Sequence, residues 1–389
     1  MIMKKNFFTL FAGAFFTVML LCSCNAVQAS KNNPSVLTAK QEKLLKVGYF
    51  VGDGSNGNGV FHWARLLKNS PQLDVTLLVG EDIRNGKLDD LDLLVIPGGS
   101  SRRQYLNVTE KGGDKIREFV KKGGSYVGIC AGFHCTLDKP DRFRLMPYTY
   151  RKGAGGYRAK VAIDINERGA ELLDIKKGRY FVTYSRGPIS KEVKEWEHGK
   201  AETLGIYRST VSHIGVKSNF MNAPAMIYGN YGKGKVIATS FHPEMHREND
   251  PVSMGCIYAV TGIRPTPVYP AKVYRPVRVA FLSTYTVGKE PIRLLWELDK
   301  EKELDVRLLG ESELSDGMLL NTDVVVMPDI NAKGKKNTLK KYKKDFEDFL
   351  ARGGRIVAGK RLADALPKHK NVTIIPSGAS FVQEALKKP

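Results

Sequence analysis

Cysteine is scarce in this chain, with 5 residues in 389. Cys22 and Cys24 fall in an apolar leader, which leaves Cys130, Cys135 and Cys256 for the folded protein. An odd number without regular spacing argues against a disulfide framework. A bridge between Cys130 and Cys135 would occupy both sulfurs, but we expect an intervening helix to hold them apart. Cys256 lies among apolar residues and is expected to be packed in a core.

Acidic residues are also few: 40 Asp and Glu face 61 Lys and Arg, for a formal net charge of +21. Such an excess favours anionic surfaces or substrates. The densest basic run, residues 333–344, has no interleaved aromatic residues of the kind that bind nucleic acid, and we expect it to form a loop and a solvated helix face. Together with an export leader, this predicts no nucleic-acid partner.

The apolar run from Phe7 to Leu21 is shorter than the ~20 residues that a membrane span needs. Two lysines precede it and small residues follow it, a pattern typical of an export signal. Leu21-Cys22-Ser23-Cys24 is similar to a bacterial lipoprotein box, which predicts a signal peptide over 1–24, a lipid on Cys24 and a tether over 25–45. The chain would then be held at the cell envelope, with the lipid as its only membrane contact. Cleavage after Ala29 would instead release a soluble periplasmic or secreted form.

From residue 46 onward, short apolar runs alternate with helical patterns. Strands are predicted at 46–51, 73–79, 92–97 and 126–130, with helices at 60–68 and 109–122. This order predicts an α/β fold with a parallel sheet and helices on both faces. Further strands, mostly antiparallel, are expected at 161–165, 180–184 and 210–216. A hairpin of residues 225–228 and 235–240 follows them.

Four prolines between residues 265 and 276 predict a linker. We therefore expect one domain over 46–264 and another over 277–389. The second domain repeats the opening pattern at 277–282, 304–311, 323–328 and 353–360, as a degenerate copy of the same βα sheet. Lys360 stands where the first copy has Cys130, and Asp329-Ile330 stands where it has two glycines, so the copy cannot perform the same chemistry.

Cys130 lies between Gly128 and Gly132, where an apolar strand is expected to turn sharply into a helix. The thiolate would be stabilised at the helix amino terminus. His242 and Glu244 follow the strand at 235–240, and the expected alternation of a strand would turn both side chains toward one cleft.

These residues can carry out acyl transfer. Cys130 would attack a carbonyl carbon, His242 would move the proton, and Glu244 would orient the imidazole. Glycines 98 and 99 follow the strand at 92–97, so the amides of Gly99 and Ala131 could stabilise the oxyanion.

Two other interpretations concern cofactors. Gly52, Gly54 and Gly57 fit the G-x-G-x-x-G pattern of dinucleotide sites, but Asp53 would occupy the place of a pyrophosphate, and we prefer a flexible rim of the cysteine cleft. His242, Glu244 and His246 could be read as metal ligands, although Pro243 breaks the helix that such a site needs. We therefore expect neither a cofactor nor a metal.

The motifs resemble the class I glutamine amidotransferase superfamily, which has a flavodoxin-like sheet and uses a Gly-x-Cys-x-Gly elbow, a Pro-Gly-Gly loop and a His-Pro-Glu pair. Within it, residues 97–99 and 123–132 are most similar to the group named after the N-terminal domain of biotin-protein ligase. The resemblance covers roughly residues 46–262, and Tyr184-Ser185-Arg186-Gly187-Pro188 is similar to a family segment near the cleft. It implies a cleft lined by Gly98, Gly128, Gly132, His134 and Tyr184.

Position 134 departs from the family, which usually has glutamine there to shape the pocket for substrate glutamine. The chain also lacks a ligase catalytic domain, so biotin attachment does not follow from the group's name. Two hypotheses remain. One is an exported cysteine hydrolase acting on an amide or acyl bond of a small-molecule or envelope-derived substrate, and the other is a non-catalytic protein that binds a ligand or another protein with this fold.

Overall fold

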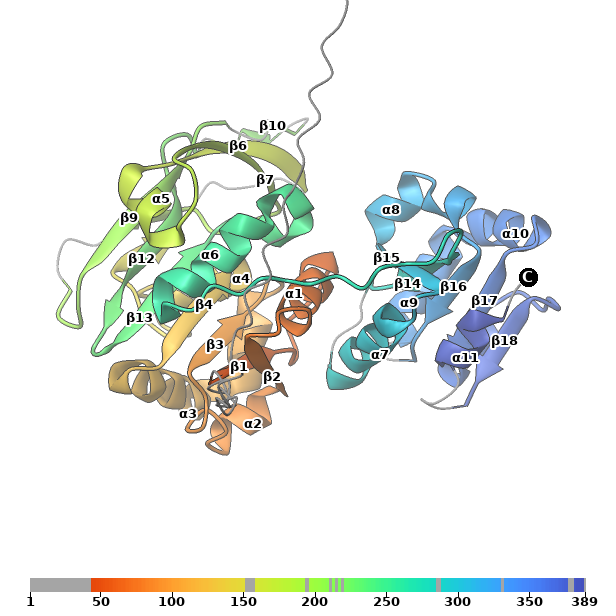
Figure 1. Ribbon diagram of the computed structural model, residues 1–389, viewed down its shortest axis with the longest axis horizontal. Helices are drawn as coiled ribbons and strands as arrows, with labels where there is room; N and C mark the ends of the chain where they lie inside the picture. The colour runs from red at the N-terminus through yellow and green to blue at the C-terminus, as the bar shows by residue number, and fades with distance from the viewer. Residues whose placement is uncertain are drawn as a thin grey trace, which may run out of the picture. The chain divides into compact units, whose positions relative to one another are not determined.

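The computed structural model describes residues 43–387 apart from 151–157, 193–195, 210–211, 214–215, 218–219, 285–287, 330–331 and 377–380. The predicted signal peptide, Cys24 and most of the tether lie outside the described residues. Residues 43–389 form one unit that contains two α/β sheets (Figure 1). No helix in the described part is long and apolar enough to cross a bilayer.

The first sheet has nine strands, and its parallel half contains the strands that end at the predicted site. These are β2 (Leu73–Leu78), β1 (Leu45–Phe50), β3 (Leu93–Ile96), β4 (Ser125–Ile129) and β13 (Gly234–Thr239), in spatial order. The sheet continues with antiparallel β12 (Pro224–Tyr231), β9 (Ala201–Tyr207), β6 (Ala159–Ile165) and β7 (Gly178–Tyr184). Two-stranded sheets pair β5 (Tyr148–Tyr150) with β8 (Ser190–Glu192), and β10 (Ser212–His213) with β11 (Val216–Lys217).

Both faces of this sheet are covered, because successive residues of its strands pack into different cores. Leu93 and Val95 belong to one cluster, while Leu94 and Ile96 belong to the other. On the first face lie α1 (Asn58–Lys68) and α6 (Asp250–Thr261), and on the second lie α2 (Gly80–Arg84), α3 (Ser101–Lys122) and α4 (Ala131–Thr136). Figure 1 shows α6 crossing the sheet beside β13 and β4. Short helices α5 (Glu167–Leu173), η1 (Pro243–Met245) and η2 (Arg247–Asn249) complete the domain.

Two predicted elements need correction. Of the strand expected at 210–216, the described residues belong to the short strands β10 and β11, and residues 210–211 and 214–215 lie outside the described part. The strand that joins the large sheet is β9, which was not predicted; it is hydrogen-bonded between β6 and β12 and buries Leu204 and Tyr207. The helix expected over 109–122 is the second part of α3, which begins earlier, at Ser101. Ser100 caps it, since its hydroxyl accepts from the amide of Arg103, and a break at Thr109 (φ 65°) divides it.

The second sheet is entirely parallel, with spatial order β15 (Leu304–Leu309), β14 (Val277–Leu282), β16 (Val324–Met327), β17 (Arg355–Gly359) and β18 (Val372–Ile375). This is the order of the parallel half of the first sheet, so the α/β class and the second, degenerate copy are confirmed. Its helices are α7 (Lys289–Lys300), α8 (Glu311–Ser315), η3 (Met318–Asn321), α9 (Ala332–Lys341), α10 (Lys343–Ala351), η4 (Lys360–Ala365) and α11 (Phe381–Leu386).

The two copies also share side-chain contacts. Asp92 accepts from the amide of Lys46 at 2.9 Å, and Asp323 accepts from the amide of Arg278 at 2.8 Å. Gln104 donates to the carbonyl of Pro97 at 2.9 Å, and buried Lys335 donates to the carbonyl of Pro328 at 2.5 Å. These contacts link the ends of neighbouring strands and helices in both copies.

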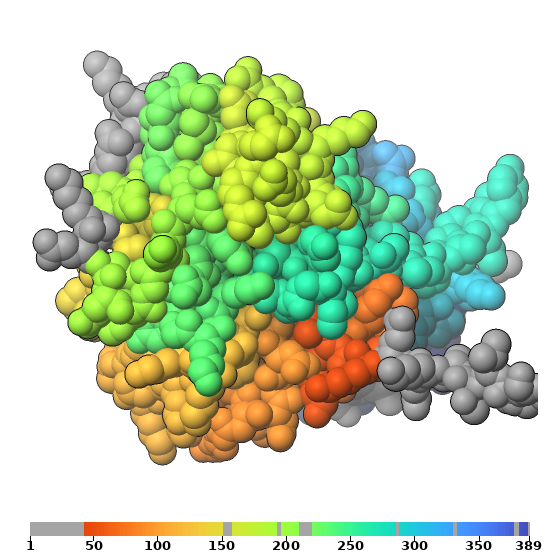
Figure 2. Space-filling view, turned by 60° about the vertical axis from the view of Figure 1, so that its left-hand side comes forward, coloured from red at the N-terminus to blue at the C-terminus, as the bar shows by residue number. Residues whose placement is uncertain are grey.

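Helix α1 packs against the second sheet. Arg65 forms a bidentate ion pair with Asp299, at 2.7 and 2.8 Å, and the indole of Trp296 donates to the carbonyl of Ala64 at 3.0 Å. The rings of Phe61 and Phe281 lie 5.4 Å apart within a core shared by both sheets. Residues 265–276 contain no helix or strand and lie on the surface (Figure 2).

A further contact predicts how acid affects stability. Lys289 of α7 and Lys87 lie 2.6 and 2.7 Å from the Asp82 carboxylate. Burial alone would raise the pKa of Asp82, but both lysines and the amide of Val79 outweigh it and lower the pKa to about 2. Because the folded pKa is below the unfolded one, this stabilisation is present above about pH 4 and is lost as the pH falls toward 2.

We therefore expect Asp82→Asn to lower the free energy of unfolding by about 1–2 kcal/mol at pH 7, measured by urea denaturation. At pH 3 the difference between variant and wild type should be about half as large. A difference that is equal at both pH values would contradict this role.

Candidate active site

Cys130 occupies a strained turn directly after β4. Its backbone has φ 52° and ψ −96°, and its amide donates to the carbonyl of Thr239 on β13 at 2.7 Å. A side chain at Gly132 would approach the Ile96 carbonyl oxygen to 2.1 Å, and one at Gly128 would approach the Gly132 backbone to 2.7 Å. The elbow glycines therefore allow α4 to pack closely on β3 and β4, as the sequence predicted.

His242 reaches the same place from β13. Its amide donates to the carbonyl of Thr183 on β7 at 2.8 Å, and its Nδ1 lies 2.8 Å from Oε1 of Glu244. The expected strand alternation is wrong, since β13 ends at Thr239 and Pro243–Met245 is a 3₁₀ turn. The turn, and not a strand, directs the Glu244 carboxylate back to the imidazole.

The charge of this pair follows from its surroundings. The Glu244 side chain is 0% exposed and that of His242 is 11% exposed. Burial alone would lower the pKa of His242, but the charges of Glu244 and Cys130, and hydrogen bonds to both, outweigh it and raise that pKa well above its usual value. The raised pKa favours the imidazolium form of His242, which places a positive charge at the cavity that Cys130 also lines.

The environment of Cys130 differs from that of the other two thiols. Cys130 lines a cavity and its Sγ lies 3.6 Å from the carbonyl oxygen of Ser185. Cys135 and Cys256 form no disulfide among the described residues and are buried, and burial raises the pKa of each thiol to about 12. Among the described cysteines, Cys130 alone borders this cavity.

Glycines from two loops make room for the imidazole and the carboxylate. A Cβ at Gly98 would lie 2.5 Å from Cε1 of His242. A Cβ at Gly59, the second residue of α1, would lie 2.3 Å from Oε1 of Glu244 and 3.1 Å from Nδ1 of His242. The sequence pointed to Gly98 but missed Gly59, although Gly59 ends the glycine-rich loop that the sequence placed at the cleft.

The proposed oxyanion donors also lie at this site. Gly99 (φ 141°) forms an isolated β-bridge with Ser55. In this bridge the amide of Asn56 donates to the carbonyl of Gly98, and the amide of Ser100 donates to the carbonyl of Gly54. Within the described residues the amide of Gly99 itself donates no backbone hydrogen bond. Ala131 is the first residue of α4, so its amide precedes the intrahelical hydrogen bonds. Gly99 lines the same cavity as Cys130.

Several expected cleft residues lie behind the cavity wall. The hydroxyl of Tyr184 donates to the carbonyl of Gly187 in the core, and His134 bonds the hydroxyl of Ser101 at 2.7 Å. Burial lowers the pKa of His134 to about 4, so its imidazole is neutral. Gly128, Gly132 and Gly98 act through close packing, as described above, and none of these residues borders the cavity.

The cavity over Cys130 has a volume of about 610 Å³ and takes its walls from both domains. From the first come Cys130, His242, Thr183, Ser185 and Arg186, the loop residues 56–59, and Arg158. From the second come Thr284 and residues 310–313. Sequence reasoning missed the second domain's contribution, since its degenerate motifs gave no sign of it.

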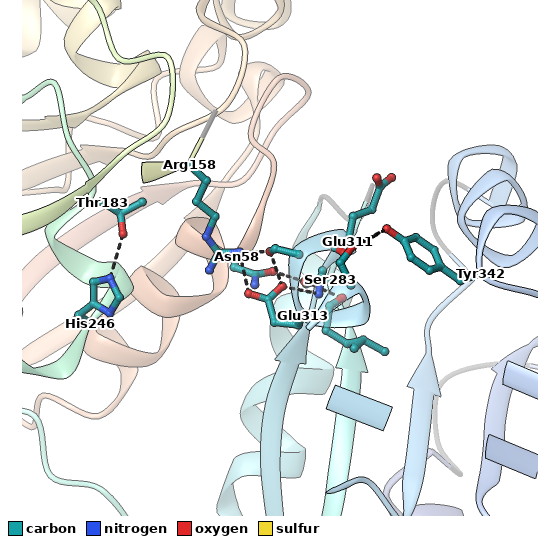
Figure 3. A network of polar contacts seen from close by, with 12 residues as sticks. Asn58, Arg158, Thr183, His246, Ser283, Glu311, Glu313 and Tyr342 are labelled. Atoms are coloured by element: carbon teal, nitrogen blue, oxygen red, sulfur yellow. Dashed lines mark hydrogen bonds and ion pairs between the residues drawn. The ribbon is translucent and has the colours of Figure 1, made fainter. Parts of the chain in front are cut away.

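The structure also bears on the alternative readings. The loop at 52–59 borders the cavity through residues 56–59, and Asp53 pairs with Arg103 at 2.5 Å. His246 bonds the hydroxyl of Thr183 at 3.0 Å (Figure 3), while Glu244 bonds His242. Within the described residues no three His, Cys, Asp or Glu side chains are grouped as metal ligands.

Comparisons with known proteins agree with this architecture. Residues 50–138 match the family described as "Biotin-protein ligase, N terminal". The biotin–protein ligase of Schizosaccharomyces pombe is 28% identical over 184 residues, which are 41% of this chain and 26% of the ligase, so the chain spans about a quarter of that relative. The PurQ subunit of phosphoribosylformylglycinamidine synthase from Rhodopseudomonas palustris strain BisB18 is 28% identical over 183 residues, 42% of this chain and 74% of PurQ.

Among solved structures, the match to a chain of PurLQS from Thermotoga maritima covers 55% of this chain and 98% of the PurLQS chain, with a TM-score of 0.39 and 16% sequence identity. The resemblance stated from the sequence is confirmed: the first domain is class I glutamine amidotransferase-like, and residues 50–138 match the group named after the N-terminal domain of biotin-protein ligase.

Proposed function

We propose that the chain is a cysteine-dependent hydrolase of the amidotransferase-like type that cleaves an amide or related acyl bond. The observation that carries this proposal is the buried His242–Glu244 pair, 2.8 Å between Nδ1 and Oε1, whose histidine lines the same cavity as Cys130. A buried ion pair with one partner in a cavity beside a strained nucleophile turn is typical of a functional site.

The reaction would proceed through a thioester. The Cys130 thiolate attacks the carbonyl carbon, and the oxyanion that forms accepts hydrogen bonds from the amides of Gly99 and Ala131. His242 gives its proton to the leaving amine as the C–N bond breaks. Water then attacks the thioester and transfers a proton to His242, which releases the acid and regenerates the Cys130–His242 pair. Glu244 holds the imidazole throughout.

The substrate would be small. A cavity of about 610 Å³ is the size that binds a drug-sized molecule, such as a small metabolite or a fragment of the cell envelope. At position 134 a neutral histidine bonded to Ser101 replaces the family's usual glutamine, so we do not expect free glutamine to be turned over.

We expect an electrophilic amide mimic, such as a chloromethyl ketone, to label Cys130 in the wild type under reducing conditions. Mass spectrometry should find the adduct on Cys130 and none on Cys135 or Cys256, because both of those thiols are buried and have a raised pKa. Cys130→Ala should abolish the labelling. If Cys130 stays unlabelled, the alternative is favoured: a non-catalytic protein that binds its ligand in the same cavity.

We further propose that the chain acts at the cell envelope, attached by a lipid on Cys24, with a soluble periplasmic or secreted form as the alternative. The lipoprotein box at residues 21–24 supports this. Incorporation of a labelled fatty acid that is lost in Cys24→Ser would support the anchor, and cleavage after Ala29 would contradict it.

A further inference from the structure

Arg158 lies at the cavity wall where the two domains meet. Arg158 borders the cavity together with Cys130 and with Ser312 and Glu313 of α8 in the second domain. Figure 3 shows Arg158 extending from the first domain toward Glu313, next to the contact between Asn58 and Ser283. Residues of both domains therefore meet at this side of the site.

Glu313 holds this guanidinium in place. Nη1 of Arg158 donates to Oε1 of Glu313 at 2.7 Å and also to the hydroxyl of Ser312. Oε2 of Glu313 accepts from the amide of Gly310 at 3.0 Å and from the Ser312 hydroxyl at 2.9 Å. The Glu313 side chain is 14% exposed, so the carboxylate is a fixed partner that is anchored from two sides.

Arg158 keeps donors for a ligand. Both of its contacts use Nη1, and within the described residues neither Nε nor Nη2 has a protein partner. A guanidinium has five N–H donors in a planar fork, which matches the two oxygens of a carboxylate. An arginine that a neighbouring acid holds still loses less entropy when it binds such a group.

We propose that Arg158 determines substrate specificity by binding a carboxylate on the acyl part of the substrate, and that Glu313 of the second domain is its positioning residue. The substrate is then a carboxylate-bearing amide, with the carbonyl at Cys130 and the carboxylate at Arg158. This inference rests on the proposed function of Cys130. It gives the second copy a role in the site although it has no nucleophile of its own.

Two alkylating reagents that differ in a single group can test whether Arg158 binds a carboxylate. Iodoacetate and iodoacetamide both transfer a two-carbon unit to sulfur with loss of iodide, but only iodoacetate carries a carboxylate. The ratio of their rates at Cys130, followed by mass spectrometry, should fall about tenfold in Arg158→Gln and by less in Arg158→Lys, which keeps the charge but loses the fork. Glu313→Gln should lower the ratio about threefold.

The matched control is Arg168→Gln, which removes one positive charge from α5, where Arg168 is 52% exposed and pairs at 3.5 and 3.6 Å with Glu202 and Glu171. Its ratio should equal that of the wild type. Variants that merely loosen the fold change both rates together, so the ratio separates specificity from structure.

Equal ratios in wild type and Arg158→Gln, with both reagents reacting at Cys130, would overturn the inference and leave the proposed function intact. If neither reagent modifies Cys130 in the wild type, the proposed function itself fails.

Discussion

His242→Ala is expected to slow the alkylation of Cys130 by iodoacetamide at pH 7 by at least about a hundredfold. In the wild type, the raised pKa of His242 favours the imidazolium, and a positive charge beside the reacting sulfur assists its attack as an anion. Without the imidazole this positive charge is lost, while the buried Glu244 carboxylate remains.

His246→Ala is the appropriate control. Its imidazole lies in the same turn region but bonds the hydroxyl of Thr183 at 3.0 Å, and Glu244 bonds His242 instead. Cys130 should therefore react with iodoacetamide at close to the wild-type rate in this variant. If the His242 and His246 variants lose reactivity equally, the loss is due to a disturbed turn, and the role assigned to His242 is wrong.

Gly98→Ala should remove most of the reactivity of Cys130 through a single added methyl group. The new Cβ would lie 2.5 Å from Cε1 of His242, a distance that forces the imidazole to move. Gly98 does not have a left-handed backbone conformation, so the clash and not the backbone causes the loss. We expect at least a tenfold lower alkylation rate and a loss of about 1–3 kcal/mol in the free energy of unfolding, as in overpacked cores.

Gly113→Ala provides the comparison, since Gly113 lies inside α3 and a Cβ there would meet its nearest atoms at 3.7 Å, an ordinary contact. That variant should gain about 0.5–1 kcal/mol from helix propensity and keep the reactivity of Cys130. A fully reactive Gly98→Ala would show that the imidazole has a second productive position.

Much of this architecture could be predicted from local patterns. The buried strands were identified because fully covered parallel strands are continuous apolar runs, and the glycines around Cys130 marked the elbow. The strand at 201–207 was missed because its apolar residues are separated by Glu202, Thr203 and Gly205, and its assignment depends on pairing with β6 and β12. A short stretch of sequence does not show which distant strand it will pair with.

The site was predicted less completely, for a similar reason. Cys130, His242 and Glu244 were found by their motifs, and the structure brings them together. Gly59 and Arg158 were missed because each matters only through a neighbour that is distant in the sequence. The contribution of residues 310–313 depends on how α1 packs against the second sheet, which no motif encodes.

A comparison of the two copies shows which contacts belong to the shared α/β sheet and which features occur only beside Cys130. Both copies retain an aspartate that holds the first strand, and a phenylalanine whose ring leaves no room for a side chain at the glycine before the fourth strand, Phe119 over Gly124 and Phe349 over Gly354. After its third strand the first copy has Gly98, which makes room for the imidazole of His242. In the second, Asp329 fills that place so closely that a methyl at Gly359 would touch its carboxylate at 2.4 Å. The contacts that hold strands and helices together are thus common to both sheets, whereas the glycine that accommodates the imidazole occurs in the first and is exchanged for an aspartate in the second.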